Sequence, residues 1–75
     1  MTLDEFVSAF AAEFDETPED QFKAETEFKA LDEWSSLTAL SIIAMVDEQM
    51  DKTITGADIR ASKTIEDLFN LANCK

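Results

Sequence analysis

The sequence predicts an all-α protein, a small four-helix bundle built from three main helices and one short helix. Apolar residues recur every three or four positions along most of the chain, and no segment carries the signal of a strand. Only one Gly and one Pro interrupt the 75 residues, and 45% of the residues are apolar, including six Phe. This composition favours a folded helical domain over a disordered acidic chain. A chain of this length predicts a single domain, residues 1–75.

The first helix is predicted over residues 3–14. Thr2 can cap its N-terminus, and Glu5, three positions later, completes a capping box. The acidic run over 15–20, with Pro18 as the helix breaker, is expected to end it. The apolar face of this helix would consist of Leu3, Phe6, Val7, Phe10, Ala11 and Phe14.

The connection over residues 15–35 is long for so small a domain, and loops of this length are usually functional or disordered. A short helical turn is expected to begin near Pro18 and to include Phe22. The large apolar side chains that we expect to anchor this connection on the core are Phe22, Phe28, Leu31 and Trp34.

The second helix is predicted from Ser35 or Ser36 to Met50, and its apolar residues cover more than one helical stripe. A domain this small cannot easily bury such a helix on all sides. We therefore expect part of it to be a docking surface.

The last third of the chain predicts a short and a longer helix. Gly56 is expected to mark a turn into a helix over 57–61, and Thr64, with Asp67 three positions later, to cap the last helix. The buried face of the last helix would consist of Ile65, Leu68, Phe69 and Ala72.

Charge and missing residue types exclude several classes of function. The chain carries 17 Asp and Glu against 6 Lys and Arg, a formal net charge of −11, which argues against nucleic acids and anionic membranes as partners. No apolar run is long enough for membrane insertion, and the N-terminus lacks the basic start of a secretory signal, so we expect a cytoplasmic protein. Without His there is no Ser-His-Asp triad and no His metal site. The acidic runs also lack the spacing of a calcium-binding loop. Because the chain has neither these catalytic residues nor a recognisable metal site, we expect neither an enzyme nor a metal protein.

The serines at the start of the second helix have two interpretations. Hydroxyl side chains are common there because they cap the first backbone N–H groups. Alternatively, an exposed hydroxyl can carry a phosphate-linked group, whose charge is favourable at the positive end of the helix dipole. Position alone leaves both interpretations open.

The pair Ser36-Leu37 opens the second helix, which is rich in Ile, Leu, Met and Val. With this pair, the chain resembles the acyl carrier protein family over nearly its whole length. In that family, a serine at the start of the second helix bears a 4′-phosphopantetheine arm that derives from coenzyme A. The resemblance implies that Ser36 is the attachment site of this covalent cofactor, with Ser35 as the less favoured alternative. Further matching features are the capped first helix, the long loop, the second helix ending in Asp47-Glu48, the turn at Ile54, and Thr64-Ile65 opening the last helix.

The resemblance also implies the partners. They would be a phosphopantetheinyl transferase and acyl-transfer and ketosynthase-type enzymes with basic docking patches, which act on a monomeric carrier. The pathway would be fatty-acid or polyketide-like biosynthesis. The positions of the second helix that match partner-facing residues of the family are Leu37, Leu40, Ser41, Ala44, Asp47 and Glu48.

The chain departs from the family pattern before and after Ser36. Ser35 replaces the usual Asp, which in the family helps the transferase to position its metal and coenzyme A. Residues 32–33 are Asp-Glu instead of Leu-Gly, and Ser41 replaces a frequent acidic residue. These departures leave an alternative of a different class, an unmodified acidic helical adaptor that keeps the carrier fold and docks partners through the second helix.

Overall fold

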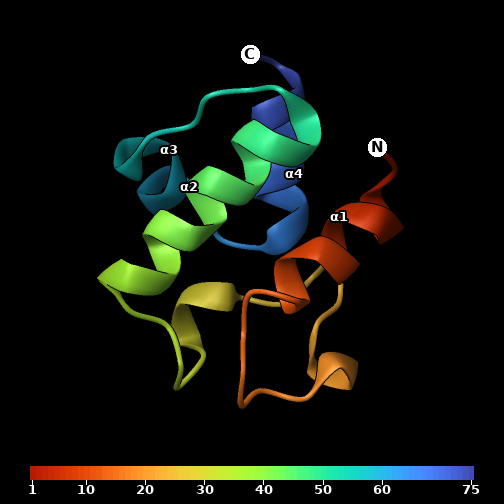
Figure 1. The fold of residues 1–75 in the computed structure, drawn as a ribbon, viewed down its shortest axis with the longest axis vertical. Coiled ribbons are helices and arrows are strands. Elements are labelled where there is room, and N and C mark those ends of the chain that lie inside the picture. Colours follow the sequence, from red (N-terminus) through yellow and green to blue (C-terminus); the bar gives the residue numbers. More distant parts are fainter.

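Four α-helices and two short 3-10 turns form the protein in a computed structural model that describes all 75 residues (Figure 1). The order along the chain is α1 (Leu3–Ala11), the 3-10 turns Glu19–Gln21 and Phe28–Ala30, α2 (Ser36–Met50), α3 (Gly56–Ala61) and α4 (Ile65–Asn73). There is no strand, which confirms the predicted all-α bundle of three main helices and one short helix. No helix combines the length and the apolar character that a membrane span requires.

The helix α1 starts as predicted but ends at Ala11, three residues before the predicted end. The predicted capping box is present: the Thr2 hydroxyl accepts a hydrogen bond from the Glu5 N–H, and the Glu5 carboxylate accepts one from the Thr2 N–H. After Ala11 the chain tightens, and the N–H of Phe14 donates to the carbonyl of Ala11. This tighter turn buries the Phe14 ring in the core, so tertiary packing ends the helix before Pro18 can.

The long connection between α1 and α2 is part of the folded core. It covers the lower end of the molecule in Figure 1, where both of its 3-10 turns lie. The first of these turns begins at Glu19, close to the predicted start, but it ends at Gln21, so Phe22 lies directly after it and not within it. Phe22 and Phe28 are buried, whereas Leu31 and Trp34 are half-buried against the core. Backbone hydrogen bonds from the first two residues of α4 to residues 24 and 26 tie the connection to that helix.

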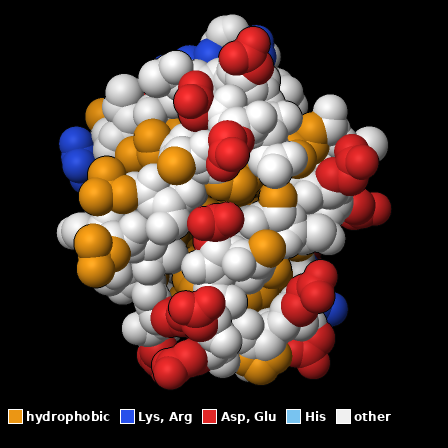
Figure 2. Space-filling model, in the orientation of Figure 1, with side chains coloured by type: hydrophobic (Ala, Val, Ile, Leu, Met, Phe, Trp, Pro, Cys, Tyr) orange, Lys and Arg blue, Asp and Glu red, His pale blue; other side chains and the backbone are white.

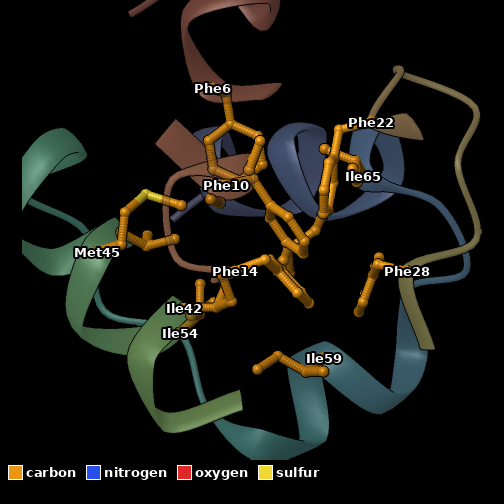
Figure 3. Packing of buried hydrophobic residues seen from close by; sticks show 14 residues of the cluster. Phe6, Phe10, Phe14, Phe22, Phe28, Ile42, Met45, Ile54, Ile59 and Ile65 are labelled. Carbon is orange, nitrogen blue, oxygen red and sulfur yellow. The ribbon is translucent and has the colours of Figure 1, made fainter. Parts of the chain in front are cut away.

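Five of the 14 buried core residues are Phe (Figure 3). The Phe10 ring is central, because its centroid lies 5.3–6.4 Å from five other aromatic rings, those of Phe6, Phe14, Phe22, Phe28 and Trp34. The aliphatic part of the core comes mainly from α2, α3, α4 and the segments between them. Its larger buried residues are Ile42, Met45, Val46, Ile54, Ile59, Ile65 and Leu68.

Capping boxes begin both C-terminal helices, as Thr55 with Asp58 caps α3 and Thr64 with Asp67 caps α4. The predicted role of Gly56 as a turn residue is wrong, because it is the first residue of α3 and has no positive φ. In α4, three of the four residues predicted to face the core are buried, and the fourth, Phe69, is half-buried.

The residue that takes up the left-handed backbone conformation is Asp51, at the end of α2 (φ 55°). Glycine adopts this conformation without the steric cost of a Cβ, and a carboxylate is unfavourable at the negative end of a helix. Asp51→Gly is therefore expected to raise the free energy of unfolding by about 0.5–1 kcal/mol in urea denaturation. Asp51→Ala is the matched control because it removes the same charge but keeps a Cβ. Equal stabilisation in both variants would contradict the conformational cause.

Candidate functional site

The two serines at the start of α2 have different roles. Ser35 is the N-cap, with an extended backbone, and its hydroxyl oxygen accepts a hydrogen bond from the Thr38 N–H at 3.3 Å. Ser36 is the first residue of the helix; its side chain is exposed and takes part in none of the hydrogen bonds of the chain. The capping interpretation therefore applies to Ser35, and the Ser36 hydroxyl is left accessible.

The start of α2 is fixed on the core by the residues before it. The half-buried Trp34 ring lies 5.0 Å from the Phe28 ring and stacks on that of Phe10, so Trp34 anchors this end of the helix on the core. The Thr38 hydroxyl donates to the carbonyl of Glu33 at 3.0 Å, which fastens the first turn of α2 to the preceding segment. These contacts hold the backbone of Ser36 in place.

Glu33 organises this region, a role that sequence reasoning missed. Its carboxylate accepts hydrogen bonds from the N–H groups of Asp15, Glu16 and Thr17 at 2.9–3.0 Å and from the Thr17 hydroxyl at 2.8 Å. It thereby joins the segment after α1 to the segment before α2. The Thr17 hydroxyl contributes most to holding the pKa of Glu33 below its ordinary value of 4.5, and the three N–H groups lower it further.

The lowered pKa of Glu33 predicts a pH-dependent contribution to stability. A carboxyl group with a lower pKa in the folded state stabilises the protein fully above its unfolded pKa, and this contribution is lost as the pH falls through the folded pKa. Glu33→Gln is therefore expected to lower the urea midpoint at pH 7 and to flatten the loss of stability between about pH 5 and 3. Urea denaturation at several pH values measures both effects.

The control for this experiment is Glu48→Gln, which removes an exposed carboxylate of α2 that makes no side-chain hydrogen bond. Some pH dependence will remain in Glu33→Gln, because cap N–H groups also lower the pKa values of Glu5 and Asp67. If Glu33→Gln and Glu48→Gln give the same pH profile, the carboxylate of Glu33 does not hold the two segments together.

The outer face of α2 is apolar near Ser36 and acidic at its far end. The side chains of Leu37 and Leu40 are 76% and 62% exposed, an unusual state for large apolar residues, and Ala44 is exposed one turn further on. Figure 2 shows apolar side chains at the surface over the start of α2 and acidic side chains over much of the same face. Of the six predicted partner-facing residues, five are exposed and Ser41 is half-buried: Leu37, Leu40, Ser41, Ala44, Asp47 and Glu48.

A hollow of about 290 Å³ lies beside Ser36, between the start of α2 and α3. Its polar lining includes both serines and two basic side chains, Lys29 and Arg60, which sequence reasoning did not single out. Its remaining lining residues are Trp34, Ala39, Gly56 and Ile59. The hollow thus combines a free hydroxyl, positive charge and apolar surface.

The chemical group that this site exposes to solvent is the Ser36 hydroxyl, which makes no hydrogen bond within the chain. No His exists in the chain, and no Asp or Glu lines the hollow beside Ser36. The site can carry and orient an attached group. No protein-family model, curated protein or solved structure matches the chain.

Proposed function

We propose that the chain is an acyl carrier protein that carries acyl intermediates as thioesters on a 4′-phosphopantetheine arm attached to Ser36. The observation that carries this proposal is the exposed, unbonded Ser36 hydroxyl at the first position of a 15-residue helix whose cap is supplied by Ser35. No acidic residue occupies the first turn of α2, so the phosphodiester would meet the positive end of the helix dipole without a competing carboxylate.

The protein itself would not be an enzyme. The reactive group is the terminal thiol of the arm, and the chain supplies the attachment point, the tether and the recognition surface. A short flexible tether raises the concentration of the bound acyl group at a partner's active site to roughly the millimolar range. This division of roles explains how a chain without His can serve acyl transfer.

The surface around Ser36 supports a particular class of partners. Leu37 and Leu40 offer exposed apolar contact, and Asp47 and Glu48 extend the same helix with negative charge. With a net charge of −11, the chain would be steered toward basic patches around active sites, and its encounters would weaken with salt. The partners that we propose are a phosphopantetheinyl transferase and acyl-transfer and ketosynthase-type enzymes of fatty-acid or polyketide-like biosynthesis. The carrier would act as a cytoplasmic monomer.

Intact-mass measurement tests the proposal. The purified chain is incubated with coenzyme A and a phosphopantetheinyl transferase of broad specificity, and we expect the mass to increase by one phosphopantetheine group. No mass increase with several different transferases would refute the carrier function.

A second candidate function is favoured by the exposure of Leu37 and Leu40 together with Ser35 in place of an acidic residue. These features also suit an unmodified acidic helical adaptor that docks partner proteins through α2. Such an adaptor would gain no mass in the same experiment. Its binding of a partner would survive Ser36→Ala and would be lost in Leu37→Glu.

Restoring the acidic residue before Ser36 is expected to speed up the modification. Asp caps a helix as well as Ser does, so Ser35→Asp preserves the start of α2. A hydrogen bond to a charged group is worth roughly 1.5–3 kcal/mol, so the initial rate of arm attachment should rise on the order of tenfold or more. The rate is measured as the fraction of modified chain over time. An unchanged or slower rate in Ser35→Asp would contradict the role that the family resemblance gives to this position.

A further inference from the structure

Glu33, three positions before Ser36, is held by hydrogen bonds at both its side chain and its backbone. Its carboxylate accepts four hydrogen bonds from residues 15–17 at 2.8–3.0 Å, of which Oε1 takes three and Oε2 takes one. Its carbonyl oxygen accepts one from the Thr38 hydroxyl at 3.0 Å. A single residue therefore connects the segment after α1 with the first turn of α2, at the lower end of the molecule in Figure 1.

The charges around Glu33 do not favour a carboxylate at this place. The hollow that it lines is also lined by Glu16 and Asp32, and no Lys or Arg lines it. The one salt bridge of the chain joins Lys75 to Asp58, so no cation pairs with Glu33. Neutral donors alone hold the carboxylate among like charges. Its position consequently depends on these hydrogen bonds and not on ionic attraction.

The path from Glu33 to Ser36 is short and is fixed on both sides. Only two residues separate them in the sequence. Thr38, on the far side of Ser36, returns to this path twice, because its hydroxyl donates to the Glu33 carbonyl and its N–H donates to the Ser35 hydroxyl. The Ser36 side chain makes no hydrogen bond of its own. The orientation of its hydroxyl is therefore set by a backbone that Glu33 and Thr38 hold in place.

We propose that Glu33 is a positioning residue for arm attachment, which holds the Ser36 hydroxyl in the orientation that the transferase requires. This role rests on the proposed function. In the attachment step, the Ser36 oxygen bonds to the phosphorus next to the pantetheine part of coenzyme A. The pyrophosphate P–O bond breaks, adenosine bisphosphate leaves, and the hydroxyl proton passes to a base of the transferase. The attacking and leaving oxygens must lie roughly in line in such a transfer, so a displaced hydroxyl reacts slowly even in the bound carrier.

A positioning role and a merely stabilising role predict different kinetics. The proposed docking residues Leu40, Asp47 and Glu48 lie beyond the first turn of α2, and no hydrogen bond of Glu33 reaches them. A carrier whose Glu33 is released would bind the transferase as before but react less often, which lowers kcat and leaves KM unchanged. Partial unfolding would instead reduce the concentration of folded carrier, which raises the apparent KM and leaves kcat unchanged.

Thr17 offers a test of this role far from Ser36 in the sequence, because its hydroxyl contacts the Glu33 carboxylate at 2.8 Å. Thr17→Val keeps the shape of the side chain but removes this donor, whereas Thr17→Ser keeps it. A hydrogen bond to a charged group shifts an equilibrium by roughly tenfold or more. The kcat of arm attachment, measured by intact mass over a range of carrier concentrations, should therefore fall about three- to tenfold in Thr17→Val, with KM changed less than about twofold. Thr17→Ser should restore kcat.

Thr26→Val is the matched control. Thr26 is half-buried like Thr17 and lies in the same connection, and its hydroxyl makes two hydrogen bonds, neither of them to Glu33. Its loss should leave kcat unchanged. Glu33→Ala should lower kcat at least as far as Thr17→Val does. Adding Thr17→Val to Glu33→Ala should have no further effect on kcat, because the acceptor of the hydroxyl is already absent.

Trp34, the only Trp of the chain, directly follows Glu33 and reports on the same segment without any arm. Acrylamide should quench its fluorescence more strongly in unmodified Thr17→Val than in the unchanged chain or in Thr26→Val; equal quenching would overturn the proposal. An unchanged kcat in Thr17→Val, or a loss that persists in full on the Glu33→Ala background, would also overturn it while the carrier function stands. No mass gain in the unchanged chain would refute the carrier function and remove the role in arm attachment with it.

Discussion

Replacing Ser36 by alanine is expected to abolish attachment of the phosphopantetheine arm while leaving the fold intact. Only a hydroxyl oxygen can form the phosphodiester; both serines at the start of α2 are exposed, but only the Ser36 hydroxyl makes no hydrogen bond. Its side chain makes no hydrogen bond that the substitution could break, and alanine is a good helix former at this position. Intact mass after incubation with coenzyme A and the transferase should therefore remain that of the unmodified chain, while the urea midpoint should change little.

The matched control is Ser35→Ala, which is expected to lower the stability of the fold but to leave arm attachment intact. Loss of the capping hydroxyl is expected to lower the free energy of unfolding by about 1 kcal/mol, since the Thr38 N–H loses its acceptor. Ser36 remains, so the mass gain should persist. A mass gain that survives in Ser36→Ala but disappears in Ser35→Ala would move the attachment site to Ser35.

Features that depend on neighbours three or four positions apart could be predicted from the sequence. The capping boxes of α1 and α4 are examples, because a hydroxyl and a carboxylate three residues apart suffice to specify them. The start of α2, predicted at Ser35 or Ser36, follows in the same way from its capping hydroxyl. The apolar density of the helix predicted that part of it stays exposed, whereas the choice of Leu37 came from the family resemblance.

Features that depend on distant residues could not be predicted. Glu33 binds N–H groups 16–18 positions before it, and no local pattern marks those groups as its partners. The early end of α1 depends on the burial of Phe14. Asp51 in a left-handed conformation runs against the expectation that the only glycine of the chain marks the tight turn. In each case, packing of the whole chain overrides local preference.

The candidate site also combines a residue that the local sequence specifies with residues that only the folded chain brings together. Sequence reasoning could place Ser36 at the start of α2, but the basic side chains beside it come from the long connection and from α3. Lys29 and Arg60 are 31 positions apart, and they meet only because the connection packs against the end of α3. A net charge of −11 conceals such a local concentration of positive charge.

Phe10→Ala is expected to remove a large share of the stability of the protein. The Phe10 side chain is fully buried, and its ring neighbours five of the six other aromatic rings of the chain. Truncation of a buried Phe to Ala typically costs about 3–5 kcal/mol. A chain of 75 residues has a total stability of roughly 4–11 kcal/mol at typical values per residue. A large part of the variant should therefore be unfolded at 37 °C, as measured by circular dichroism and urea denaturation.

Two further substitutions make this expectation specific to packing. Phe10→Leu keeps most of the volume and should cost less than half as much, whereas Leu37→Ala, at a site 76% exposed, should stay within about 0.5 kcal/mol of the unchanged chain. A loss below about 1 kcal/mol in Phe10→Ala would contradict the central role of this ring.

Because the Trp34 ring stacks on Phe10 at 6.4 Å, a substitution of Phe10 also removes support from the segment that presents Ser36. Arm attachment should consequently slow in Phe10→Leu even while that variant remains folded, which would link the aromatic core to the accessibility of the modified hydroxyl.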